Sequence, residues 1–170
     1  MLSAELFMPP VLGDGGTYAT LAKMKSLAQG AAAIPLVRAT AAHILEGASP
    51  DGTEEAKLIR GWVQENTAFL RDLSTSEALY HPLEVIIEIQ KHGIAQIDCE
   101  DVAMLAAALG MSVGLRARFV VLAFRKGGPF QHVFAELAGP QGQMWIDVDT
   151  TRPSQMFESV FPTRTFRTEV

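Results

Sequence analysis

The spacing of apolar residues changes near the middle of the chain, and this change restricts the possible folds more than any other feature. Residues 102–109 are an unbroken run of Val, Ala, Met and Leu, which together with residues 99–101 predicts a buried helix over 99–109. Gly110 stands where a helix often ends in a left-handed residue. Beyond it, apolar and polar residues alternate, which is typical of strands.

Strands are therefore predicted in the second half of the chain, over residues 115–124, 132–138 and 143–149. Short stretches with Gly and Pro separate them, and connections this short favour antiparallel neighbours. In the first half, helical spacing and capping residues predict helices over residues 17–28, 35–46, 54–71 and 83–89. We expect an α+β fold in which N-terminal helices pack on a C-terminal antiparallel sheet.

A single domain over residues 1–170 is expected, because a chain of 170 residues with 48% hydrophobic content can bury one sizeable core. Residues 54–151 should form its central part. Residues 1–16 are punctuated by Pro and Gly and predict an irregular lead-in. Residues 94–97 predict a loop, and no element is predicted in the tail over residues 152–170.

Composition argues against several classes of partner. The formal charge of −5, without a long run of one sign, argues against nucleic-acid binding. No apolar run approaches the length of a bilayer span and no export signal opens the sequence, so we expect a cytoplasmic protein without membrane contact. One cysteine cannot form an internal disulfide, and the four histidines are not at metal-ligand spacing from it. No metal or other cofactor is predicted.

The lone cysteine, Cys99, opens the predicted buried helix. A helix N-terminus carries partial positive charge and free N–H groups, both of which stabilise a thiolate. The neighbouring Asp98, Glu100 and Asp101 oppose this, because nearby negative charge disfavours a second anion. Position alone therefore leaves open whether Cys99 is a nucleophile or a packing residue, and activation would need an imidazole from elsewhere in the fold.

His132 is the best candidate for that imidazole. It begins a predicted strand, and the period of two places it on the same face as Phe134 and Glu136. A carboxylate should then orient the ring. The segment "WIDVD" supplies Asp147 and Asp149, which share a strand face, so alternation leaves the choice between them open.

Three segments together resemble the transglutaminase-like superfamily: "DCEDVAMLAAALG", "HVFAE" and "WIDVDTT". They are similar to its three blocks, namely an acid-preceded cysteine that opens a helix, a strand that begins with histidine, and a tryptophan-containing strand that ends in aspartate. The resemblance is strongest over residues 96–151. The family's catalytic aspartate lies four residues after the tryptophan, which corresponds to Asp149. At Ile97 the chain departs from the glycine that the family commonly has two residues before the cysteine.

The resemblance implies a papain-like triad, with Cys99 as the nucleophile, His132 as base and then acid, and Asp149 holding the imidazole. Sulfur attack on an amide carbonyl would give a thioester and release an amine. We expect the backbone N–H of Cys99 to stabilise the oxyanion, with Gln96 and Gln90 as candidates for the second donor. The expected activity is that of a cysteine protease or amidase on peptide or protein amides. The sequence predicts no oligomeric state.

Two other functions are consistent with the same residues. A non-enzymatic interaction or assembly protein of phage or prophage type would keep the fold without the activity. An amine, in place of water, would make the protein a transglutaminase or a small-amine acyltransferase. Hydrolysis is favoured over transfer because 170 residues leave little for additional parts that would exclude water.

Overall fold

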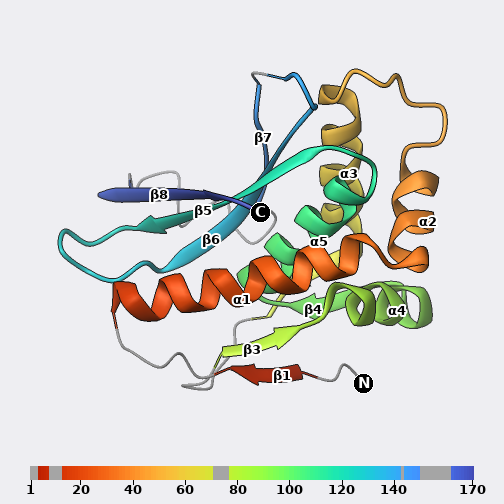
Figure 1. Cartoon of the computed structure of the whole chain (residues 1–170). Helices are drawn as coiled ribbons and strands as arrows, with labels where there is room; N and C mark the ends of the chain where they lie inside the picture. Colours follow the sequence, from red (N-terminus) through yellow and green to blue (C-terminus); the bar gives the residue numbers. More distant parts are fainter. Residues whose placement is uncertain (1–3, 8–12, 71–76, 143, 150–161) are drawn as a thin grey trace.

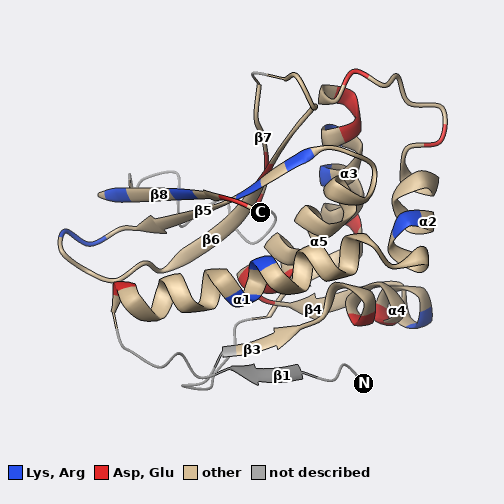
Figure 2. Cartoon of the chain, in the orientation of Figure 1, with Lys and Arg blue, Asp and Glu red and all other residues tan. Residues whose placement is uncertain are grey.

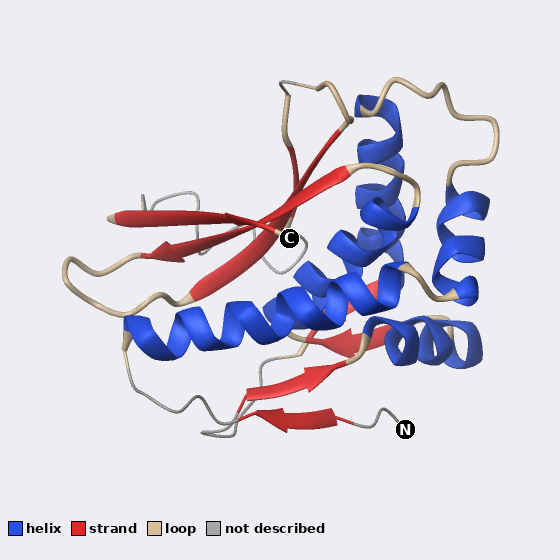
Figure 3. Ribbon diagram, in the orientation of Figure 1, coloured by secondary structure: helices blue, strands red, loops and turns tan. Residues whose placement is uncertain are grey.

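The computed structural model describes residues 4–7, 13–70, 77–142, 144–149 and 162–170, and their helices and strands are drawn in Figures 1 and 3. The helices of this described part are α1 (Asp14–Ala32), α2 (Pro35–Ile44), α3 (Thr53–Asn66), α4 (Pro82–His92) and α5 (Cys99–Ser112). Its strands are β1 (Ala4–Phe7), β2 (Thr67–Phe69), β3 (Glu77–Tyr80), β4 (Ala95–Ile97), β5 (Arg116–Ala123), β6 (His132–Ala138), β7 (Ile146–Val148) and β8 (Arg164–Glu169).

The described strands form one larger sheet and two small ones. The larger sheet has the strand order β7-β6-β5-β8 and is antiparallel throughout. β1 pairs with β3 in an antiparallel ladder, whereas β2 and β4 form a short parallel pair. Figure 1 shows α5 between the larger sheet and the outer helices α2 and α4. The predicted α+β class, with early helices packed on a late antiparallel sheet, is confirmed.

Helix α5 is the centre of the hydrophobic core. Its residues 101–110 are all buried, and it contacts helices α1 to α4 as well as strands β5 and β6. A helix that is apolar on every side must be covered on every side, which explains why this run lacks amphipathic spacing. The largest side chains buried in this core include Met104, Leu105, Leu109, Phe119 and Leu137. Among the described helices, none is long and apolar enough to cross a membrane.

The prediction that Gly110 ends α5 is wrong. The helix continues to Ser112, and the residue of left-handed conformation after it is Gly114, with φ of +88°. Gly110 is instead needed for close packing, because a Cβ atom there would lie 2.7 Å from the Leu137 side chain on β6. The lack of a side chain at this position lets the helix and the strand approach each other.

The ends of the chain contain more structure than the sequence indicates. Residues 4–7, expected to be irregular, form β1, and α1 begins at Asp14 rather than at residue 17. In the expected tail, β8 pairs with β5 over six residues and completes the four-stranded sheet. Residues 152–161 of that tail lie outside the described part of the chain. The last predicted strand is shorter than expected, and its first residue, Gln143, also lies outside the described part.

The pairing of β2 with β4 was not predicted either. Residues 67–69 were expected to continue a helix and residues 94–97 to form a loop, yet Thr67, Ala68 and Phe69 pair with Ala95, Gln96 and Ile97. Helix α3 therefore ends at Asn66. Strands of three residues carry too little periodicity to show in a sequence, and parallel partners lie far apart in the chain. This pairing matters because β4 leads directly into Cys99.

Candidate active site

Cys99 is the first residue of α5, directly after β4 and the N-cap residue Asp98. The Asp98 side chain accepts a hydrogen bond from the Asp101 backbone N–H, with 3.3 Å between nitrogen and Oδ1. This is the usual capping arrangement, in which a side-chain oxygen satisfies an N–H of the first turn. Cys99 itself is partly buried against the main core. The structure therefore has the Cys99 thiol at a helix N-terminus, as the sequence predicts.

His132 and Asp149 lie together at one end of the larger sheet. His132 is the first residue of β6, and Asp149 follows the last residue of β7. Because β7 runs antiparallel to β6, with Ala135 opposite Val148, its end lies near the beginning of β6. His132 Nε2 is 2.8 Å from Asp149 Oδ2, and the two side chains are only 6% and 2% exposed.

Strand alternation leaves the choice between Asp147 and Asp149 open, and the structure places the two side chains in different environments. Asp147 lies opposite Glu136 on the neighbouring strand, is exposed, and forms an ion pair with Arg60 at 3.3 Å. Asp149 alone of the two is buried and contacts the imidazole. Its contact uses Nε2, so Nδ1 is the ring nitrogen that would exchange a proton with a nucleophile. Phe134 stacks beside the ring at a centroid distance of 6.1 Å and helps to fix its plane.

The thiol of Cys99 lies against the first residues of β6. The backbone N–H of Val133, the neighbour of His132, acts on the sulfur as a hydrogen-bond donor and lowers the pKa of Cys99. β7 pairs only with residues 135–137 of β6, so this part of the strand lies beyond the end of its neighbour. The start of α5 and the His132–Asp149 pair therefore lie at the same end of the larger sheet.

The electrostatic environment of the thiol opposes ionisation. The Cys99 thiol donates a hydrogen bond to the Glu100 carboxylate, with 2.8 Å between Sγ and Oε2. Burial raises the pKa of Cys99 far above its ordinary value, and the charge and hydrogen bond of Glu100 and the charge of Asp98 raise it further. Burial and the two acids together thus outweigh the Val133 N–H. In this arrangement Cys99 is a thiol at neutral pH.

Asp101, expected from the sequence to be one of the negative charges beside Cys99, is instead a buried acid. It is 1% exposed, and its Oδ1 accepts a hydrogen bond from the Tyr80 backbone N–H at 2.8 Å. Its Oδ2 is buried without a hydrogen-bond partner among the described residues. Burial, followed by the charge of Asp98, raises the pKa of Asp101 to about 9, so this side chain is a neutral carboxylic acid at neutral pH. It joins the end of β3 to the first turn of α5.

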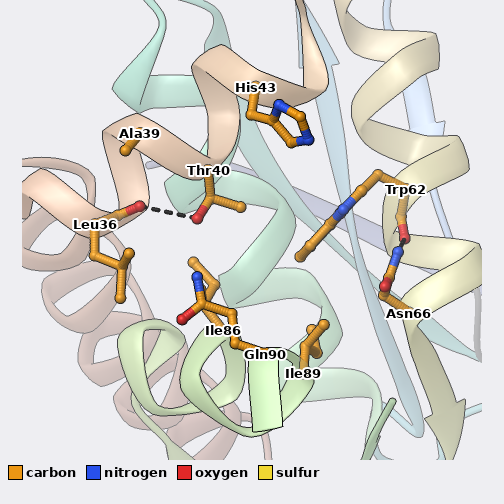
Figure 4. A pocket seen from close by; sticks show the side chains of 9 residues that line it. All are labelled: Leu36, Ala39, Thr40, His43, Trp62, Asn66, Ile86, Ile89 and Gln90. Carbon is orange, nitrogen blue, oxygen red and sulfur yellow. Dashed lines mark hydrogen bonds between the residues drawn. The ribbon is translucent and has the colours of Figure 1, made fainter. Parts of the chain in front are cut away.

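The two glutamines proposed as oxyanion donors lie in different places. Gln96 is exposed in the middle of β4. Gln90 lines a cavity of about 370 Å³ between α2, α3 and α4, into which the Trp62 side chain points from α3 toward Thr40 and His43 on α2 (Figure 4). None of the three predicted catalytic residues lines this cavity. The structure therefore gives Gln90 no place at Cys99.

A second group of charged residues lies on the same sheet face as His132. Arg118 pairs with Glu136 across β5 and β6, and Arg167 on β8 lies 3.7 Å from the same carboxylate. The Arg118 guanidinium also stacks over Trp145 at 3.9 Å from the ring centroid. Figure 2 shows positively charged residues, here arginines, on both β5 and β8. The charged residues of the strands are thus paired with one another and with Trp145.

Among the described residues, no cluster of His, Cys, Asp and Glu is suited to hold a metal ion.

Comparison with known proteins gives a family and a fold. A family model of the transglutaminase-like superfamily matches residues 38–150, which include all three predicted catalytic residues. The crystal structure of a proposed cysteine protease from Cytophaga hutchinsonii superposes with a TM-score of 0.52 and 21% sequence identity. The match covers 76% of this chain but only 41% of that protein, so this chain spans about two fifths of its length. No curated protein matches.

Proposed function

Because the chain belongs to the transglutaminase-like superfamily, we propose that it cleaves amide bonds by thiol chemistry, as a cysteine protease or amidase. The observation that carries this proposal is the buried hydrogen bond between His132 and Asp149. It lies at the end of the larger sheet where α5 begins with Cys99. A buried imidazole held by a carboxylate next to a thiol is the arrangement that nucleophilic catalysis needs.

Each of the three residues then has one role. As the Cys99 sulfur bonds to the substrate carbonyl carbon, its proton passes to His132 Nδ1, and Asp149 stabilises the imidazolium that forms. The tetrahedral intermediate collapses to a thioester while the imidazolium gives its proton to the departing amine. Water, deprotonated by the same imidazole, then releases the acid and restores the thiol.

The raised pKa of Cys99 determines when the proton moves. A thiol that is stable at neutral pH does not form an ion pair with His132 before the substrate arrives. We therefore propose that the proton leaves as the sulfur attacks, as in hydroxyl nucleophiles, rather than in advance. The developing oxyanion would be stabilised by the backbone N–H of Cys99, since the first N–H group of a helix has no acceptor within the helix.

The proposal is tested by hydrolysis of a library of peptides and simple amides, with products identified by mass spectrometry. Cys99→Ala and His132→Ala should each lower kcat/KM on the order of a thousandfold or more, with folding checked by circular dichroism. Full activity in Cys99→Ala would overturn the proposal. So would amine transfer in preference to hydrolysis when a primary amine is added, because the protein would then be an acyltransferase.

A further inference from the structure

We propose that the cavity between α2, α3 and α4 binds a small, neutral aromatic amide, at a site separate from the proposed active site. The cavity has a volume of about 370 Å³. Pockets that hold small molecules have volumes of roughly 300–1,000 Å³ and are lined mainly by apolar side chains with a few placed polar groups. None of Cys99, His132 and Asp149 lines this cavity, so ligand binding there does not depend on the proposed function.

The walls of the cavity are mainly apolar and come from all three helices. Ile86 and Ile89 on α4 close its base, since they are only 1% and 6% exposed. Leu36 on α2 and Trp62 on α3 lie on its sides, and Figure 4 shows the indole projecting into the space between the helices. Trp62 is only partly buried against the core, so part of its ring is left for a ligand. A second aromatic ring suits this wall, because aromatic pairs favour stacked and edge-to-face contacts.

Polar groups that face the cavity are available to a ligand. The Gln90 amide points from α4 toward Thr40 on α2, and no described residue forms a hydrogen bond with it (Figure 4). Within the described part of the chain, the Trp62 indole N–H donates to no acceptor either. Thr40 Oγ1 donates to the Leu36 carbonyl oxygen at 2.9 Å and can still accept a hydrogen bond. A carboxamide complements this set, because it offers both donors and an acceptor.

The lining also favours a ligand without charge. Asp, Glu, Lys and Arg are all absent from the described residues around the cavity. His43 is the one titratable residue among them, but its side chain is 82% exposed and lies 3.6 Å from the equally exposed Glu46. An ion that entered the cavity would lose hydration without gaining a buried counter-ion. A neutral ligand is therefore expected.

Four small compounds of similar size separate these requirements. Benzamide has the ring and the amide without a charge. Benzoate and benzamidinium keep its shape but are negative and positive, and cyclohexanecarboxamide keeps the amide but loses the planar ring. Binding to the full chain is followed by ¹⁵N–¹H NMR through the indole N–H signal of Trp62. The chain has two tryptophans, so Trp145→Phe identifies this signal.

We expect benzamide to shift the Trp62 signal in a saturable manner, with a Kd in the millimolar range that is usual for so small a ligand. The two ions and cyclohexanecarboxamide should each bind at least about fivefold more weakly, because they lack a counter-ion or a flat ring. No shift up to the solubility limit of benzamide would overturn the proposal. Equal binding of benzamide and either ion would also overturn it.

Substitutions in the chain locate the bound compound. Gln90→Leu should weaken benzamide binding about fivefold through lost hydrogen bonds. Gln29→Leu is the matched control, since it makes the same change at an exposed site on α1. Ala39→Phe should occupy the cavity from its exposed rim and abolish the shift.

All three replaced positions are exposed, so the fold should persist, and the rest of the spectrum checks this. Equal effects of Gln90→Leu and Gln29→Leu, or unaltered binding in Ala39→Phe, would place benzamide outside the cavity and contradict the proposal.

Discussion

At the scale of single residues, the two aspartates of "WIDVD" show how the structure adds to the sequence. Strand alternation predicts that both lie on one face, two residues apart, and residue type alone does not separate them. The structure gives Asp147 an exposed ion pair with Arg60 and Asp149 a buried contact with His132. The resemblance to the family had favoured Asp149. The geometry now supplies a physical reason, because only a buried carboxylate holds an imidazole firmly.

Replacing these aspartates one at a time tests the role proposed for Asp149. Asp149→Asn should lower kcat by about 100-fold or more, because an amide in place of the carboxylate no longer stabilises the imidazolium. Losses of this size or larger are typical when the aspartate of a catalytic triad is replaced. Asp147→Asn removes the same charge from the adjacent position and should keep more than half of the activity. Equal losses in the two variants, measured as initial rates of hydrolysis, would contradict the assignment.

The ionisation of Cys99 yields a prediction about pH. Burial and Glu100 raise its pKa, so alkylation by iodoacetamide should keep rising with pH beyond about 8.5, where a free thiol is half ionised. Glu100→Gln removes one of these causes and leaves burial, so its rate profile should shift to lower pH without reaching that of free cysteine. A wild-type profile that levels off below the free-thiol value would show that Cys99 is a preformed thiolate.

At the scale of the elements, the junction of β3 with α5 depends on Asp101. Its pKa is about 9 in the folded protein and about 4 in the unfolded chain. Between these values the unfolded chain binds fewer protons than the folded protein, so the free energy of unfolding falls as pH rises from about 4 to 9. Asp101→Asn keeps an acceptor for the Tyr80 N–H and does not titrate.

The stability advantage of the variant over the wild type should therefore be small at pH 4 and should grow by about 1 kcal/mol per pH unit toward pH 9, as measured by urea unfolding at several pH values. Asp101→Ala loses the acceptor for Tyr80 and should be less stable than Asp101→Asn at each pH. Identical pH dependence in wild type and Asp101→Asn would mean that Asp101 is ionised in the folded protein.

The packing of α5 on β6 depends on a missing side chain. Gly110→Ala would place a Cβ atom 2.7 Å from the buried Leu137 side chain and should destabilise the protein by about 1–3 kcal/mol. Gly61 in α3 has open space where a Cβ atom would lie, so Gly61→Ala should stabilise by up to about 1 kcal/mol through helix propensity. Thermal unfolding measures both, and a stabilising Gly110→Ala would refute the close approach.

At the scale of the whole molecule, the parts predicted from sequence are those with strong local patterns. The apolar run of α5 and the alternation in β5 and β6 identified the α+β class, and the residues Cys99, His132 and Asp149 were named from motifs. The pairings of β1 with β3, β2 with β4 and β8 with β5 join segments far apart in the chain, and short strands leave little trace in a sequence. The contact of Glu100 with Cys99 was also missed, because adjacent residues in a sequence need not touch through their side chains.

The central claim is that Cys99 becomes acylated with the help of His132, and trapping of the acyl-enzyme tests it most directly. Mixing the protein with p-nitrophenyl acetate should release a burst of about one equivalent of p-nitrophenol, with the acetyl group found on Cys99 by peptide mass spectrometry. The burst should be absent in Cys99→Ala and much slower in His132→Ala. Acetylation of Cys99 no faster than that of free cysteine, and at the same rate in His132→Ala, would contradict the account.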